Sequence, residues 1–85
     1  PIVSREPVQA TEIYIQAGAF IDFDNANKLS ASLSPLGAAK VYQVLINGQD
    51  FYRVRLGPVY DVAEADQLLA KLINNGHTNA RIVIE

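Results

Sequence analysis

The chain has 85 residues, a formal net charge of −2, 49% hydrophobic residues and no cysteine. This length predicts one domain, and the composition is that of a folded globular protein rather than a disordered chain. The negative balance disfavours a nucleic-acid backbone as partner, because such binding needs a clustered basic surface. No apolar run approaches the ~20 residues that a membrane-spanning helix requires. The start at Pro1, without an initiator Met, suggests a domain of a longer protein.

The N-terminal part of the chain predicts a linker, a strand and a helix. Residues 1–11 hold two prolines and no sustained period, which is typical of a linker, so the domain is expected at residues 12–85. Ile13 to Ala17 alternates in hydrophobicity and predicts a strand that ends at Gly18. The helix that follows is indicated by candidate N-caps, an apolar stripe and stop residues: Asp22, Asp24, Ala26, Leu29, Leu33, Pro35 and Gly37.

The C-terminal part predicts a hairpin, a helix and a last strand. Strands at Lys40 to Ile46 and Phe51 to Leu56 flank Asn47-Gly48, a strong turn signal, and Gly57-Pro58 is expected to end the second of them. A last β-rich strand is expected at Ala80 to Ile84. The helix between them is indicated by a capping pair, an apolar stripe and a C-terminal glycine: Asp61, Glu64, Ala65, Leu68, Leu69, Leu72 and Gly76.

The order β-α-β-β-α-β predicts an α+β, ferredoxin-like (RNP-like) fold. Its four-stranded antiparallel sheet carries both helices on one face and leaves the other face open.

An internal repeat assigns residues to these two faces. A shift of 39 positions superposes Gly18 on Gly57 and brings the caps and the helix stripes into one register without gaps. Two helix–turn pairs can share such spacing by chance, but glycines, cap and stripe agree together, which favours a duplicated βαβ unit. The residues predicted to face the helices are Ile13, Ile15, Ala17, Tyr52, Val54 and Leu56. The alternation of a strand then puts the intervening residues on the open face: Tyr14, Gln16, Phe51, Arg53 and Arg55.

The open face has a chemical character that suits sugars. Phe51 offers a flat apolar plate, Gln16 an amide, and Arg53 and Arg55 forks of donors, with Arg81 of the last strand beside them. Saccharides present apolar C–H faces and hydroxyls, and muramic acid adds an acyl oxygen or carboxylate that an arginine can hold. The alternative is that these are solvated residues that only stabilise the sheet. The register of the Lys40 strand leaves open whether Tyr42 and Val44, or Val41 and Gln43, face this side.

Other residues do not predict catalysis. His77 is the single histidine, and it lies in a turn where a metal site or a triad would lack companions. The clustered carboxylates precede helices, where capping and the helix dipole account for them. We therefore expect neither an enzyme, a metal nor a cofactor.

Two segments resemble the SPOR domain, a family of peptidoglycan-binding modules. They are YIQAGAF at Tyr14 to Phe20, followed by Asn25, and YRVRLGP at Tyr52 to Pro58, the latter similar to the C-terminal modules of rare lipoprotein A-type septal lytic transglycosylases. The resemblance implies a partner, glycan strands stripped of stem peptides, and a location at the periplasmic side of the division septum. It also implies a monomer that targets a parent protein there.

The resemblance further implies a set of glycan-binding residues. Gln16 matches a sugar-binding glutamine, Phe51 a stacking aromatic, and Arg53 a groove arginine. The remaining implied positions are Tyr14, Ala19, Phe20, Asn25, Arg55 and Arg81. Two departures stand out: Ala19 replaces a common serine, and Phe51 a common tryptophan. Each loses a hydrogen-bonding group, worth about 0.5–1.5 kcal/mol.

Two other functions remain as alternatives to glycan binding. One is an RNA-recognition-like module, which shares the order of elements and for which Tyr14 and Phe51 could stack bases. The net charge and the lack of the family's aromatic segment disfavour it. The other is a ferredoxin-like regulatory or oligomerisation domain that pairs through its edge strands.

Overall fold

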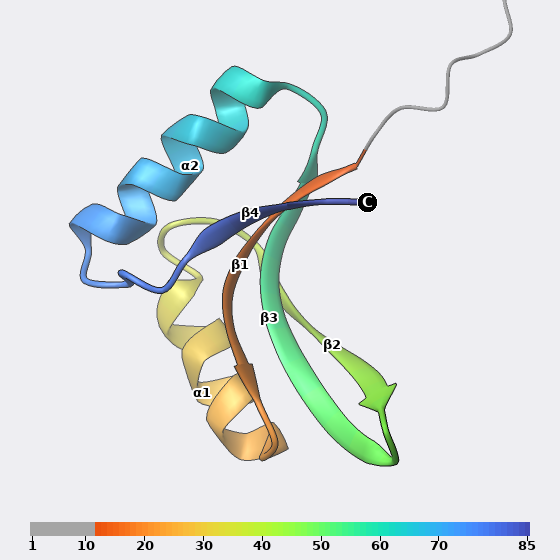
Figure 1. Cartoon of the computed structure of the whole chain (residues 1–85). Helices are drawn as coiled ribbons and strands as arrows, with labels where there is room; N and C mark the ends of the chain where they lie inside the picture. The colour runs from red at the N-terminus through yellow and green to blue at the C-terminus, as the bar shows by residue number, and fades with distance from the viewer. Residues whose placement is uncertain (1–11) are drawn as a thin grey trace, which may run out of the picture.

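The structure, a computed structural model, describes residues 12–85, so the linker predicted at residues 1–11 lies outside the described part. The elements follow the predicted order (Figure 1). They are β1 (Ile13–Phe20), α1 (Phe23–Leu33), β2 (Ala39–Ile46), β3 (Gln49–Val59), α2 (Val62–Asn74) and β4 (Arg81–Ile84). No helix among residues 12–85 has the length and hydrophobicity to cross a membrane.

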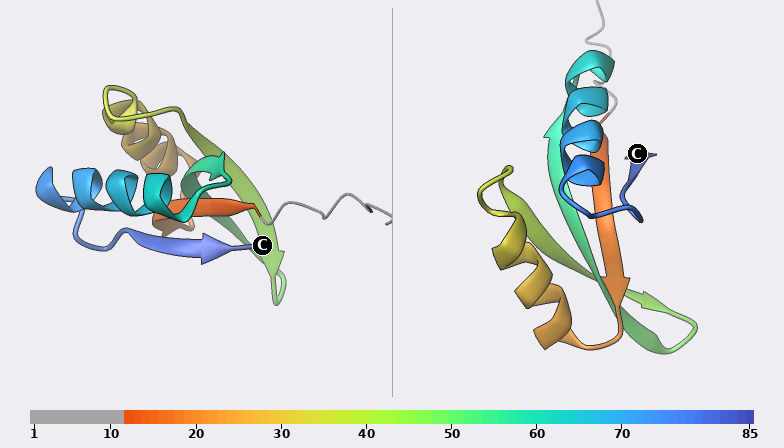
Figure 2. Two further views of the ribbon diagram at one scale, coloured as in Figure 1. Left: turned by 90° about the horizontal axis from the view of Figure 1, so that it is seen from above. Right: turned by 90° about the vertical axis from the view of Figure 1, so that its left-hand side faces the viewer.

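The four strands form one antiparallel sheet in the order β2-β3-β1-β4. Figure 2, seen from the helical side, shows α1 and α2 both in front of the sheet, so the opposite face is not covered by a helix. The predicted fold is therefore confirmed: two layers, with helices on one side of a ferredoxin-like sheet.

Each helix begins after one of the two aspartates that the repeat aligns, Asp22 and Asp61. Asp22 accepts a hydrogen bond from the backbone N of Asp24 at 3.0 Å, and Asp61 accepts one from the N of Ala63 at 3.0 Å. Asp22 is thus the N-cap, whereas Asp24 lies in the first turn, where a negative charge favours the helix dipole. Asp61 bonds the N–H of Ala63 rather than that of Glu64, so the cap differs from the reciprocal capping box.

The core lies between the helices and β1 and β3, and the helices contribute to it from positions that the repeat aligns. Its members from the helices, each with 0% exposure and each pair related by the 39-residue shift, are Ala26, Leu33, Ala65 and Leu72. They pack on Ile15, Val54 and Leu56, which are at most 1% exposed. Burial of each leucine, isoleucine or valine among them contributes about 1.5–3 kcal/mol, so these residues fix which face of the sheet the helices cover.

Two glycines predicted to end strands do not end them. β1 continues through Gly18 to Phe20 because Ala17 forms a bulge: Gln16 pairs with Arg55, and the next pair is Gly18 with Val54. β3 continues past Gly57-Pro58 by a second irregularity. Gly57 has φ of 127°, and a Cβ there would lie 2.9 Å from the carbonyl oxygen of Ile13, so only glycine fits without strain.

Candidate functional site

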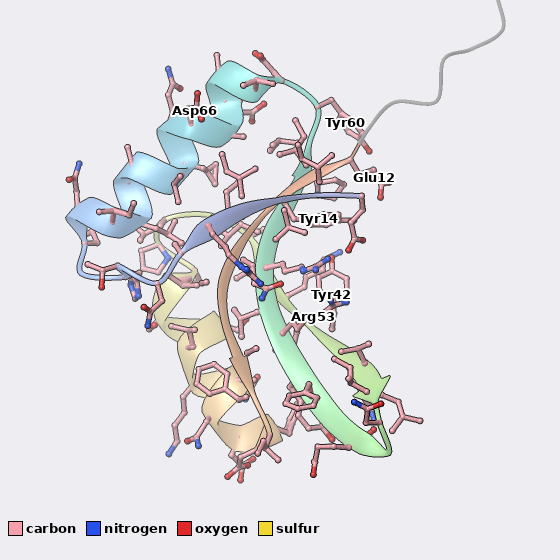
Figure 3. The ribbon with its side chains drawn as sticks, viewed as in Figure 1. Glu12, Tyr14, Tyr42, Arg53, Tyr60 and Asp66 are labelled. Atoms are coloured by element: carbon pink, nitrogen blue, oxygen red, sulfur yellow. The ribbon has the colours of Figure 1, made fainter. Side chains whose placement is uncertain are left out.

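The open face of the sheet receives side chains from all four strands. Tyr42 and Val44 of β2 pair with Arg53 and Phe51 of β3, so they share that face. The sequence left the alternation of β2 undecided, and this register assigns it. Tyr14 of β1 meets Tyr42 edge to face, with ring centroids 5.9 Å apart. Figure 3 shows Tyr14, Tyr42 and Arg53 gathered on the side of the sheet away from the helices.

A groove of about 340 Å³ runs over the middle of this face. Its lining residues are Gln16, Ala19, Ile46, Phe51, Arg53, Arg55, Arg81, Val83 and Glu85. We call it the central groove. The bulge at Ala17 is what brings Ala19 into it, because it shifts the alternation of β1 so that Ala19 pairs with Arg53 on the open side.

Arg53 has a buried donor in the central groove that no side chain or backbone group of the described residues satisfies. Its Nε is buried and has no hydrogen-bond partner within residues 12–85. A buried donor without an acceptor costs about 1–3 kcal/mol, so an occupant that supplies an oxygen would recover that free energy. Arg81 of β4 is exposed and pairs with Gln16 of β1, whose partner on β3 is Arg55.

Arg55, two residues further along β3, is placed differently. It is only 4% exposed, its Nε donates to Gln16 Oε1 at 3.0 Å, and its Nη1 donates to Glu85 Oε2 at 3.0 Å. Its guanidinium carbon lies 5.3 Å from the centroid of the Tyr14 ring. Charge-assisted bonds and a cation–π contact thus compensate for the burial of this cation.

Tyr14 supports Arg55 and does not line the groove. Its hydroxyl donates to Glu12 Oε1 at 3.2 Å. Burial raises the pKa of Tyr14 above its usual 10.0, and the hydrogen bond to Glu12 and the nearby charge of Glu85 act in the same direction. The tyrosine therefore remains a neutral donor over the physiological range.

A second cavity, of about 430 Å³, opens at the edge of β1. β4 has four residues and pairs only with Ile13 to Gln16, so the edge of β1 at Ala17–Phe20 has no partner strand among the described residues. We call this cavity the edge hollow; its lining residues are Gln16, Ala17, Gly18, Ala19, Phe20, Leu29, Gly76, His77, Thr78, Asn79 and Arg81. It shares Gln16, Ala19 and Arg81 with the central groove, so the two depressions adjoin at these residues.

The structure brings most of the predicted site residues together. Those in the central groove are Gln16, Ala19, Phe51, Arg53, Arg55 and Arg81. Phe20 pairs with Tyr52 on the helical side and lines the edge hollow instead. Asn25 lies exposed in the first turn of α1 and lines neither depression. Its predicted role remains untested.

Several residues that line the two depressions were not predicted from the sequence. Val83 and Glu85 follow Arg81 at the period of a strand, so alternation along β4 could have found them. The turn from Gly76 to Asn79 gave no such signal, because only the tertiary fold brings it beside β1.

The charge of the central groove is opposite to that of the chain. Three arginines and one glutamate line it, a formal charge of +2, against −2 for the whole chain. An anionic or oxygen-rich ligand is therefore favoured there. Within residues 12–85, no three His, Cys, Asp or Glu side chains gather where they could hold a metal ion.

Comparisons with known proteins give consistent matches. The SPOR domain family matches residues 9–83. The endolytic peptidoglycan transglycosylase RlpA of Pseudomonas aeruginosa is 42% identical over 60 residues, which are 68% of this chain and 18% of that protein. The chain thus corresponds to about a fifth of this relative.

Two solved structures share the fold. The crystal structure of the RlpA SPOR domain from Pseudomonas aeruginosa has a TM-score of 0.73 and 34% identity, covering 84% of this chain and 96% of that one. The solution structure of the peptidoglycan binding domain of the Bacillus subtilis cell wall lytic enzyme CwlC has a TM-score of 0.71 and 24% identity, covering 96% and 99%.

Proposed function

Because the chain belongs to the SPOR domain family, we propose that it binds peptidoglycan, and specifically glycan strands that lack stem peptides. The observation that carries the proposal is the depression formed by the central groove and the adjoining edge hollow, in which an aromatic ring lies beside several hydrogen-bond donors. The names of its relatives, a peptidoglycan transglycosylase and a peptidoglycan binding domain, agree with this ligand class.

The chemistry of the depression matches a sugar chain. Phe51 offers its ring to the C–H face of a pyranose, while Gln16 and Arg53 offer donors to hydroxyl and acyl oxygens. At the edge hollow, the side of β1 that faces away from β3 has no partner strand over Ala17–Phe20 in the described part of the chain, so its outward-pointing N–H and C=O groups are available as well. A flat ring between polar groups is the arrangement that orients a saccharide.

The preference for bare glycan has a steric basis. Each cavity holds a few hundred cubic ångströms, the lower end of the range for small-molecule sites. A strand lying along the depression would turn some lactyl groups toward the sheet, and a peptide on each would hold the sugars away from Phe51 and Gln16.

We assign the chain a binding role and no catalysis. In the proposal it acts as a monomer and carries a parent protein to the division septum, on the periplasmic side of the cell wall. Stem-peptide removal during daughter-cell separation would make the septum the place where its ligand is most abundant.

Cosedimentation with purified sacculi tests the ligand. We expect the fraction of protein that pellets to rise after an amidase has removed stem peptides, because more glycan becomes accessible. Equal or lower retention after amidase treatment would contradict the proposal.

Localisation tests the role. A fluorescent fusion exported to the periplasm of a dividing bacterium is expected to concentrate at the septum and to spread evenly when it carries Arg53→Ala. An even distribution of the unaltered fusion would contradict septal targeting while leaving glycan binding intact.

A further inference from the structure

The amide of Gln16 is held in one orientation. Arg55 Nε lies 3.0 Å from Gln16 Oε1, and a guanidinium has donors only. The amide atom facing it must therefore be the oxygen. This leaves Gln16 Nε2, with two donors and no hydrogen-bond partner within residues 12–85, for an occupant of the central groove.

Arg55 is poorly placed to donate a hydrogen bond to a ligand in the central groove. Its second bond goes to Glu85, Tyr14 lies against its guanidinium, and it is 4% exposed. Turning it toward a ligand would break both hydrogen bonds and leave Glu85 without its cationic partner. Arg55 therefore acts on the groove through Gln16.

The consequence is a groove whose free polar groups are mainly donors. They are the Gln16 amide nitrogen, the Arg53 guanidinium with its unpartnered Nε, and Arg81. The acidic residue that lines the groove, Glu85, already accepts from Arg55 through Oε2. Such an array fits a ligand group that only accepts and carries negative charge, which describes a carboxylate.

We propose that Arg55 is a positioning residue that fixes Gln16 as a donor, and that the central groove thereby recognises the free lactyl carboxylate of muramic acid. This inference rests on the proposed function and deepens it. A stem peptide is joined to that carboxyl by an amide bond, which removes the charge and adds an N–H donor facing other donors. Selection for bare strands is then electrostatic as well as steric.

Chemical conversion of the ligand separates the electrostatic contribution to this selectivity from the steric one. Denuded glycan oligosaccharides are compared before and after carbodiimide and ammonia turn their carboxylates into primary amides, which adds almost no bulk. The 85-residue chain is expected to bind the amidated form roughly tenfold more weakly, the loss of one charge-assisted hydrogen bond. Equal affinity for both forms would overturn carboxylate recognition and leave glycan binding standing; no binding to either would overturn both proposals.

Gln16→Glu tests the donor. The variant keeps the shape of the side chain and strengthens the pair with Arg55, but it offers the groove no N–H. We expect its affinity for carboxylated glycan to fall roughly tenfold and the preference over amidated glycan to disappear. Gln43→Glu makes the same change of charge at an exposed position of β2, paired with Tyr52 on the helical side, and is expected to keep the preference. Similar behaviour of the two variants would contradict the inference.

Arg55→Lys tests the positioning role. Lysine keeps the charge but lacks the planar fork that spans Gln16 and Glu85, so the amide can rotate. The ratio of affinities for carboxylated and amidated glycan is expected to fall toward one. If Arg55 had only a structural role, Arg55→Lys would instead lower the thermal midpoint and leave that ratio unchanged.

If Arg55→Lys fails to fold, Gln16→Glu decides the question together with an NMR titration of the unaltered chain. In that titration, the side-chain amide signals of Gln16 are expected to shift when glycan is added. Unshifted signals would overturn the contact.

Discussion

The two faces of the sheet are buried by different means. On the helical face, Val54 and Leu56 of β3 are at most 1% exposed because α1 and α2 cover them. On the open face, Arg55 of the same strand reaches 4% exposure without any helix, through Tyr14, Gln16 and Glu85. Apolar packing excludes water on the helical face, whereas hydrogen bonds, an ion pair and a cation–π contact bury Arg55 on the open face.

Because the two faces are buried by different interactions, one small domain can be stable on one side and keep groups free for binding on the other. The helical face carries the folding free energy, since its interactions are hydrophobic and additive in area. On the open face, Arg53 has a buried nitrogen without a partner among residues 12–85 and Phe51 is partly exposed, so neither side chain is fully engaged within the fold. Substitutions on the two faces should therefore separate stability from binding.

The largest effect is expected from Leu33→Ala on the helical face. Leu33 is 0% exposed, and its truncation should lower the free energy of unfolding by about 2–5 kcal/mol, from lost burial and a residual cavity. Chemical denaturation measures this change. Leu45→Ala, at a position 66% exposed near the hairpin tip, is the control and should change stability by less than about 0.5 kcal/mol. Comparable losses of unfolding free energy in the two variants would contradict the view that the helical face carries most of the stability.

The next effect is expected from Arg53→Ala on the open face. Its guanidinium is the donor with an unpartnered buried nitrogen, so its loss should weaken glycan binding by about 2 kcal/mol, or roughly thirtyfold. Stability should not fall appreciably, because no protein acceptor is abandoned and the buried unpartnered Nε is removed with the side chain. Lys28→Ala removes the same charge from the exposed side of α1 and is expected to leave binding unchanged. A collapse of the thermal midpoint in Arg53→Ala would make the arginine structural.

The helical face was the part that sequence could predict. The 39-residue repeat placed Leu33 and Leu72 in one core, and both are fully buried. Periodicity works there because each buried position follows from the local period of a helix or strand and from a single partner layer. The order of elements and the two caps followed from the same local rules.

The candidate site was predictable only in part. Alternation placed Arg53 and Arg55 on one face, but it could not distinguish an arginine with free donors from one whose donors are taken by Gln16 and Glu85. That distinction depends on the approach of β4 and on the bulge at Ala17, neither of which has a local signature at the affected residues. The edge hollow was missed for the same reason, since it exists because β4 is short.

A smaller effect should come from filling a gap in the groove. Ala19 pairs with Arg53 and lines both depressions, so Ala19→Ser would add a hydroxyl where a sugar oxygen can meet it. Binding is expected to strengthen by about 0.5–1.5 kcal/mol, the net contribution of one hydrogen bond, with calorimetry as the measurement. Ala38→Ser, exposed and outside both depressions, should leave affinity unchanged. Identical affinities for Ala19→Ser and the unaltered chain would place the glycan elsewhere on the open face.

The smallest effect concerns pH and the support of Arg55. Burial, with the hydrogen bond to Glu12, raises the pKa of Tyr14 above 10.0, so the folded state holds this proton more tightly than the unfolded state. The resulting stabilisation is fully present below pH 10 and is lost as the pH rises through the raised value. Tyr14→Phe keeps the ring over Arg55 but has no proton to lose. We expect the stability difference between the unaltered chain and this variant to be constant below pH 10 and to shrink above it, as measured by denaturation at a series of pH values. A constant difference across the alkaline range would mean that the Tyr14 hydroxyl is no better protected in the folded chain than in the unfolded one, and that the polar side of the sheet is more open to water than its buried arginine implies.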